Sequence, residues 1–240
     1  MFNWFGKKNT EKPLTGLAKI KADFSHMLET AQHEFMLACS VSLAGADADS
    51  VKEDLLGADK MVNRFERQIR KELVVHASVR GQIEPEILVM MSVAKDAERL
   101  GDYSKNIFDM GTISPYPPEG DDKERLLILR TLVERIFTEC RQVFENKNEE
   151  LATKIIRETT WIAKHCDHNT TRLLQLDKPT PRTASDVLMY RYMKRMVSHL
   201  RNICSSIVQP VHKIDFTKKW TRDIAPEGDL LDRKNTDETT

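Results

Sequence analysis

Two acidic residues, Glu98 and Asp102, stand four positions apart within the stretch from Asp96 to Ile107. Apolar residues around them recur at alternating steps of three and four, which predicts a helix that buries a narrow seam. Residues four apart lie above one another on one helix face, so the two carboxylates repel unless a cation lies between them. Gly101 lowers the helix propensity by about 1 kcal/mol relative to alanine, which indicates that another group approaches the backbone closely. The chemistry favoured by this pattern is cation binding.

A second pair of oxygen-bearing side chains, Asp59 and Asn63, has the same spacing on an earlier helix. If the two helices are neighbours, all four side chains can converge. Oxygen donors favour Mg²⁺, Ca²⁺, Mn²⁺ or iron over structural zinc. The sequence therefore predicts a metal site formed by Asp59, Asn63, Glu98 and Asp102. The alternative is a solvated helix face, which is the ordinary place for acids at this spacing.

Two other polar groups invite a functional interpretation. The run from His165 to His168 places two histidines on one helix face, with a polar patch at a helix end as the more ordinary explanation. The last expected helix is basic, which favours salt bridges between the halves of the chain over a surface for an acidic partner. Its basic residues are Arg191, Lys194, Arg195, His199 and Arg201.

Motifs for catalysis are absent from the sequence. There is no strained serine elbow, no phosphate-binding glycine-rich loop and no recognisable Cys/His signature. We therefore expect no catalytic residues and no enzymatic activity.

Apolar periodicity predicts six helices in an all-α fold of two tandem three-helix bundles. The first expected helix covers about 13–43, and the second runs from a break at 44–49 to about 75, with Asp49 and Ser50 as its candidate caps. The third covers about 85–110, the fourth carries Leu126 to Val143, the fifth covers about 149–174, and the sixth carries Met189 to Ile207. Pro85 stands near the first turn of the third helix, where proline is tolerated, and Pro179 and Pro181 precede the sixth. The expected division is a tail at 1–11, a first bundle at 12–110, a linker at 111–121, a second bundle at 122–213 and a polar tail at 214–240.

The second half of the chain repeats the first. Adding 100 takes Leu55 onto Ile155, and adding 96 takes Pro85 onto Pro181. The acidic pattern is not repeated. The same offsets take Asp59, Asn63, Glu98 and Asp102 onto Thr159, Ala163, Lys194 and Ser198.

Composition narrows the class of protein. Among the 240 residues, 37 Lys and Arg balance 37 Asp and Glu, which argues against nucleic acid as the main partner. The four cysteines are widely spaced, as expected of free thiols. The N-terminus runs from apolar to basic, the reverse of a secretory signal, and no apolar run approaches the about 20 residues that span a bilayer. These features predict a cytoplasmic protein.

The stretch from Asp96 to Ile107 also resembles the D-x-E-R-(I/L)-G-D…N-I signature of PhoU proteins. The matching residues are Asp96, Glu98, Arg99, Leu100, Gly101, Asp102, Asn106 and Ile107. The resemblance covers about residues 13–213 and is degenerate in the second half. It implies the six-helix PhoU-like architecture and sites for a divalent or trivalent metal ion, such as iron, magnesium, manganese or zinc. Asn63 departs from the family pattern, which has an acid there.

The PhoU resemblance further implies a homodimeric adaptor that regulates phosphate uptake. Such a protein contacts the ATPase of a phosphate transporter or a sensor histidine kinase, and meets the membrane through these partners. The alternative is an accessory regulatory subunit of an ion-coupled phosphate transporter of the Na/Pi or Pit type. A third class, a metal-dependent hydrolase on a helical bundle, predicts turnover of phosphate esters.

Overall fold

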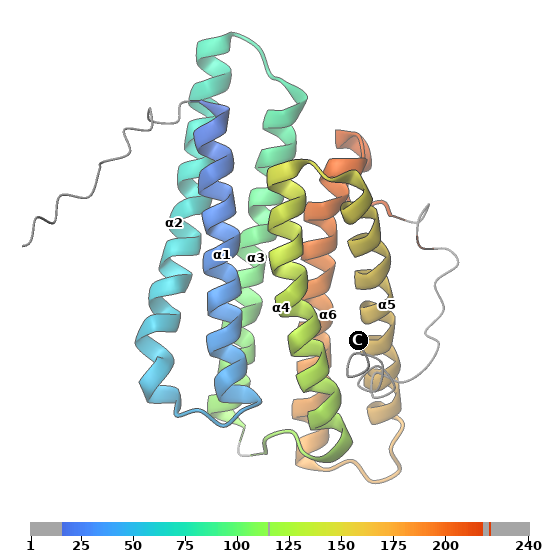
Figure 1. Cartoon of the computed structure of the whole chain (residues 1–240). Coiled ribbons are helices and arrows are strands. Elements are labelled where there is room, and N and C mark those ends of the chain that lie inside the picture. The colour runs from blue at the N-terminus through green and yellow to red at the C-terminus, as the bar shows by residue number, and fades with distance from the viewer. Residues whose placement is uncertain (1–15, 115, 218–220, 222–240) are drawn as a thin grey trace, which may run out of the picture.

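In the computed structural model, which describes residues 16–114, 116–217 and 221, six long helices make up most of the chain (Figure 1). They are α1 (Leu17–Ser42), α2 (Ala48–Arg80), α3 (Pro85–Ile113), α4 (Gly120–Asn146), α5 (Glu149–Leu174) and α6 (Pro181–Val208), followed by the short 3-10 helix η1 (Val211–Lys213). The described residues contain no strand, and the all-α prediction is confirmed.

The helix ends follow local sequence signals. Asp47 caps α2, because its side chain accepts a hydrogen bond from the Ser50 backbone N–H at 3.2 Å. The prediction of Asp49 and Ser50 as caps was wrong, since both lie inside the first turn. Pro85 occupies a first-turn position of α3, as predicted. Pro181, expected before the sixth helix, lies inside the first turn of α6.

Two helices extend further toward the C-terminus than the sequence predicted. Helix α2 continues past residue 75 to Arg80, where Gly81 adopts the left-handed conformation that ends many helices. Helix α3 continues to Ile113 and α4 begins at Gly120, so the link between them covers 114–119 and not 111–121. The tail predicted at 1–11 lies outside the described residues, and so does most of the tail predicted at 214–240. Within the described part of that second tail, Ile214 and Thr217 are buried.

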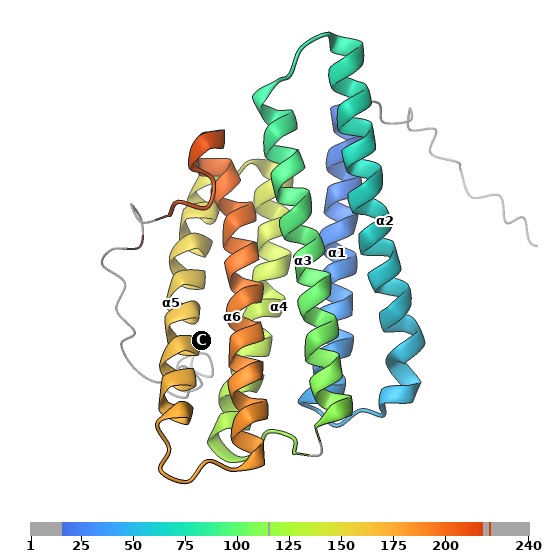
Figure 2. The ribbon, with the colours of Figure 1, turned by 180° about the vertical axis from the view of Figure 1, so that it is seen from behind.

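Helices α1, α2 and α3 pack against one another, and so do α4, α5 and α6 (Figure 2). The two groups meet where α1 contacts α4 and α3 contacts α6. Across the first contact, the rings of Phe24 and Phe144 lie 4.5 Å apart and those of Phe35 and Phe137 lie 5.9 Å apart. The buried apolar side chains of both groups form one continuous core. Within the described chain, no helix has the length and apolar character that crossing a bilayer requires.

The buried positions show the internal repeat. Adding 102 to the buried residues Phe24, Met27, Ala31 and Phe35 of α1 gives Leu126, Leu129, Val133 and Phe137 of α4, which are also buried. The offset of 96 likewise takes the buried seam of α3 onto that of α6. The two halves therefore share a packing pattern and differ in their polar side chains.

Candidate metal centre

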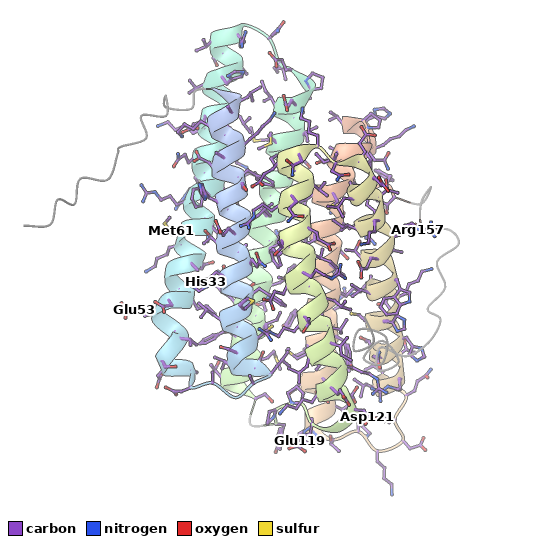
Figure 3. The ribbon with its side chains drawn as sticks, viewed as in Figure 1. His33, Glu53, Met61, Glu119, Asp121 and Arg157 are labelled. Carbon is purple, nitrogen blue, oxygen red and sulfur yellow. The ribbon has the colours of Figure 1, made fainter. Side chains whose placement is uncertain are left out.

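Three of the four predicted metal-binding residues come together around a lysine. The Lys105 ammonium group of α3 lies 2.8 Å from Asp59 Oδ1 of α2 and 3.7 Å from Asp102 Oδ1 of α3. Asn63 Nδ2 donates to Asp59 Oδ1 at 3.1 Å and to the Asp59 backbone carbonyl at 3.0 Å, so the nitrogen of this amide is directed at Asp59. Figure 3 labels two residues that help to locate this region: His33 of α1, which precedes Glu34, and Met61 of α2, which lies between Asp59 and Asn63 in the sequence.

Glu34 of α1 completes this group. Its side chain is fully buried, and neither carboxylate oxygen has a hydrogen-bond partner among the described residues. Burial raises the pKa of Glu34 to about 9; the negative charge of Asp59 adds to this effect and the positive charge of Lys105 opposes it. We call Glu34, Asp59, Asn63, Asp102 and Lys105 the Lys105 cluster.

Sequence reasoning missed Glu34, although its helical phase gave a signal. The residue stands three positions after Ala31 and four before Ala38, both on the buried seam of the first helix. A glutamate at such a position must be buried or must interrupt the seam. Its phase therefore marked it as a buried acid facing the other helices.

Gly101 accommodates the buried glutamate. A Cβ atom at this position would lie 2.9 Å from Glu34 Oε2 and 3.4 Å from Val62 Cγ1. The prediction that a group approaches the backbone here is confirmed, and the group is the Glu34 carboxylate.

Glu98 has a different set of partners. Its Oε2 lies 2.6 Å from Lys95 Nζ and 3.9 Å from Arg99 Nε. Lys95 also lies 3.9 Å from the buried carboxylate of Glu66. Asp102, by contrast, pairs with Arg99 at 3.2 Å as well as with Lys105. The repulsion expected between Glu98 and Asp102 is thus relieved by cationic side chains.

The donor chemistry of the Lys105 cluster fits a hard metal ion. Three carboxylates and one amide oxygen are the ligand types that Mg²⁺, Mn²⁺ and iron accept. The unpartnered carboxylate of Glu34 and the space left by Gly101 lie at the same place. Over the part of the chain that the structure describes, however, no three His, Cys, Asp or Glu side chains form a ready set of ligands.

The cation present in the cluster is Lys105 itself. Burial lowers the pKa of this lysine, but its hydrogen bond to Asp59 and the charges of Asp59, Asp102 and Glu34 outweigh burial, so the pKa is raised. Lys105 therefore carries its positive charge at neutral pH and balances part of the negative charge of the acids.

The polar run in α5 does not converge. His165 is buried with its ring centroid 4.0 Å from that of Trp161, and Cys166 is buried in the core. Asp167 is exposed and accepts a bond from Lys194 at 2.6 Å, while His168 is exposed. Two of these side chains face inward and two face outward, so the four do not surround a common point.

One of the basic residues of α6, His199, contacts the first half of the chain together with its neighbour Asn202. His199 Nδ1 lies 2.7 Å from Asp96 Oδ1 of α3, and Asn202 Nδ2 donates to the same oxygen at 3.1 Å. Lys194 instead pairs with Asp167 within the second half. Arg201 Nη1 donates to Thr160 Oγ1 of α5 at 3.4 Å. Bridging between the halves, which the sequence favoured, thus applies to His199 and not to Lys194.

Comparisons with known proteins agree with this architecture. The profile of the PhoU domain matches residues 24–110, the range that contains every member of the Lys105 cluster. The solved structures include a similar one, the phosphate transport system regulatory protein PhoU from Streptococcus pneumoniae, with a TM-score of 0.65. The match covers 79% of this chain and 93% of that one at 17% sequence identity, a level at which it shows a shared fold. No curated protein sequence matches the chain.

Proposed function

We propose, because residues 24–110 match the PhoU domain, that this chain regulates phosphate uptake and phosphate-starvation signalling. The observation that carries the proposal is the domain match over the residues that build the Lys105 cluster. The similar structure from Streptococcus pneumoniae, whose name assigns it to a phosphate transport system, supports it. We propose a cytoplasmic homodimeric adaptor that acts on a membrane phosphate transporter or a sensor kinase.

The proposal includes a metal ion in the first bundle. Glu34, Asp59 and Asp102 would hold it with carboxylate oxygens, and Asn63 with its amide oxygen. When bound, the ion supplies a compact positive charge shared by α1, α2 and α3. The chain's own residues position the donors: Asn63 orients Asp59, and Gly101 leaves room for the Glu34 carboxylate.

Partner capture tests the adaptor role. We would crosslink and purify the tagged full-length protein from its own host, grown with and without phosphate, and identify partners by mass spectrometry. Recovery of a phosphate-transport ATPase or a sensor kinase is the expected result. Recovery of a multi-span carrier alone would replace the proposal with the accessory-subunit alternative, and recovery of no membrane partner would overturn it.

Metal analysis tests the site. We expect the double substitution of Asp59→Ala and Asp102→Ala to lower the bound metal while the helix content measured by circular dichroism stays unchanged. Glu53→Ala is the matched control, because Glu53 is an exposed acid on α2 (Figure 3). Glu98→Ala separates the two sets of acids, since Glu98 pairs with Lys95 rather than Lys105. Equal metal content in all four proteins would exclude the site.

Absence of catalysis is also part of the proposal. The assay is hydrolysis of p-nitrophenyl phosphate with Mg²⁺, Mn²⁺ or Fe²⁺ added. We expect no turnover. Activity that disappears in Asp102→Ala would reassign the protein to the hydrolase class.

A further inference from the structure

We infer that Lys105 is a built-in competitor for the cation of the first bundle, so that a metal ion binds Asp59 and Asp102 only by displacing the Lys105 ammonium group. The inference rests on the proposed metal site. It assigns to Lys105 the role of lowering the affinity of that site for the metal ion.

The position of Lys105 carries the first step. Its ammonium group stands between a carboxylate of α2 and a carboxylate of α3, at 2.8 and 3.7 Å. A metal ion shared by Asp59 and Asp102 needs these same oxygens, and two cations at one place repel strongly. The Lys105 side chain is 33% exposed, so its flexible stem can carry the charge into solvent.

Glu34 carries the second step. Its carboxylate is fully buried beside the cluster, yet it receives no hydrogen bond from Lys105 or from any other described residue. Two cations reach these three carboxyl groups, Lys105 at Asp59 and Asp102 and Arg99 at Asp102 Oδ2, and neither is bonded to Glu34. A divalent cation would bring twice the charge of the ammonium group and would give the buried oxygens of Glu34 a partner. The cluster therefore contains more donor capacity than its lysine uses.

The second bundle has a cationic side chain at the matching position but none of the acids. The offset of 96 takes Lys105 onto Arg201, while the acids Glu34, Asp59 and Asp102 correspond to Ile136, Thr159 and Ser198. Arg201 Nη1 donates to Thr160 Oγ1 at 3.4 Å, and its Nε is buried with no hydrogen-bond partner among the described residues. Lys105, by contrast, lies against Asp59 and Asp102. Its ammonium group therefore occupies the oxygens that a metal ion would use.

The decisive experiment titrates Mn²⁺ into the metal-free full-length protein by calorimetry. We expect Lys105→Met to bind Mn²⁺ at least about tenfold more tightly than the wild type, because a neighbouring like charge has been removed. Lys105→Arg keeps the charge and should keep the wild-type affinity. In EDTA, Lys105→Met should melt at a lower temperature than the wild type, since Asp59 and Asp102 lose their partner, and Mn²⁺ should raise that melting temperature more than it raises that of the wild type.

Lys19→Met is the matched control. Lys19 also lies between two carboxylates of different helices, Asp23 of α1 and Glu72 of α2, but belongs to no cluster with an unpartnered buried acid. Its removal should leave Mn²⁺ affinity unchanged. If Lys105→Met binds Mn²⁺ no more tightly while Asp102→Ala abolishes binding, the metal site stands and the role of Lys105 is refuted. If neither the wild type nor Lys105→Met binds Mn²⁺, the metal site fails and the inference fails with it.

Discussion

Replacing Glu34 by glutamine should stabilise the metal-free protein. The glutamate is fully buried, and both of its oxygens lack a hydrogen-bond partner among the described residues. Its pKa is raised from 4.5 to about 9, chiefly by burial. Glutamine has nearly the same shape as the neutral acid and does not ionise. The substitution therefore removes the titration without opening a cavity.

The magnitude follows from the two pKa values. Between pH 4.5 and 9 the unfolded chain releases this proton while the folded protein retains it, so the folded state binds more protons and loses stability as the pH rises. Each pH unit is worth about 1.4 kcal/mol. At pH 7, about 2.5 pH units above the ordinary pKa, this destabilisation of the wild type is about 3 kcal/mol. At pH 5 it is below about 1 kcal/mol.

Urea unfolding in EDTA, followed by circular dichroism at pH 5, 6, 7 and 8, measures this difference. The free energy of unfolding of Glu34→Gln should exceed that of the wild type by a margin that widens with pH. Glu53→Gln is the control, because Glu53 is exposed on α2 and should show no such margin. A variant that is less stable than the wild type at pH 7 would show that Glu34 is ionised and stabilised by Lys105. A margin that does not change with pH would refute the buried titration.

Four further stability changes are expected, each measured by urea unfolding. Gly57→Ala should stabilise the protein by about 0.5–1 kcal/mol, because nothing lies within 4 Å of the new Cβ in the interior of α2. Gly111→Ala should destabilise it by about 1–3 kcal/mol, because the new Cβ would lie 2.8 Å from the Ser42 Cα. Asp186→Asn should stabilise by about 1–2 kcal/mol at pH 7. Burial, and then the charge of Asp122, raises the pKa of this acid from 3.8 to about 6, so the wild type loses stability between these pH values, and solvent screening reduces the loss. Phe35→Ala should lose about 3–5 kcal/mol, as the ring packs between α1 and α4.

The helices and their repeat could be predicted from sequence because both depend on local periodicity. A seam of apolar residues every three or four positions sets the phase of each helix, and Pro85 and Pro181 mark where two of them begin. The ends were harder to place. Helix α3 continues past Gly111 to Ile113, because a single glycine lowers helix propensity without ending a helix that is packed against its neighbours.

The candidate site could be predicted only in part. A spacing of four puts Glu98 and Asp102 on one helix face, but it does not determine which cation each side chain meets. Lys95 pairs with Glu98, and Lys105 pairs with Asp102. These pairs depend on the side-chain rotamers and on the neighbouring helix, which the spacing does not specify. The helical phase of Glu34 indicates a buried acid, but it does not indicate which side chains surround that acid. That neither oxygen of Glu34 has a hydrogen-bond partner among the described residues is visible only in the structure.

Helix α3 links the Lys105 cluster to the second bundle. Lys105 faces α2, while Tyr103, two residues earlier, stacks on His199 of α6 with ring centroids 5.7 Å apart. Asp96, seven residues before Tyr103 on the same helix, also contacts His199. Since a helix moves largely as a rigid body and its neighbours are close-packed, a shift of α3 that changes the cluster also changes its contact with α6. The second bundle lacks the acids but contacts α3 directly. An exchange of cations in the Lys105 cluster that moves α3 would therefore also change the contact between α3 and α6.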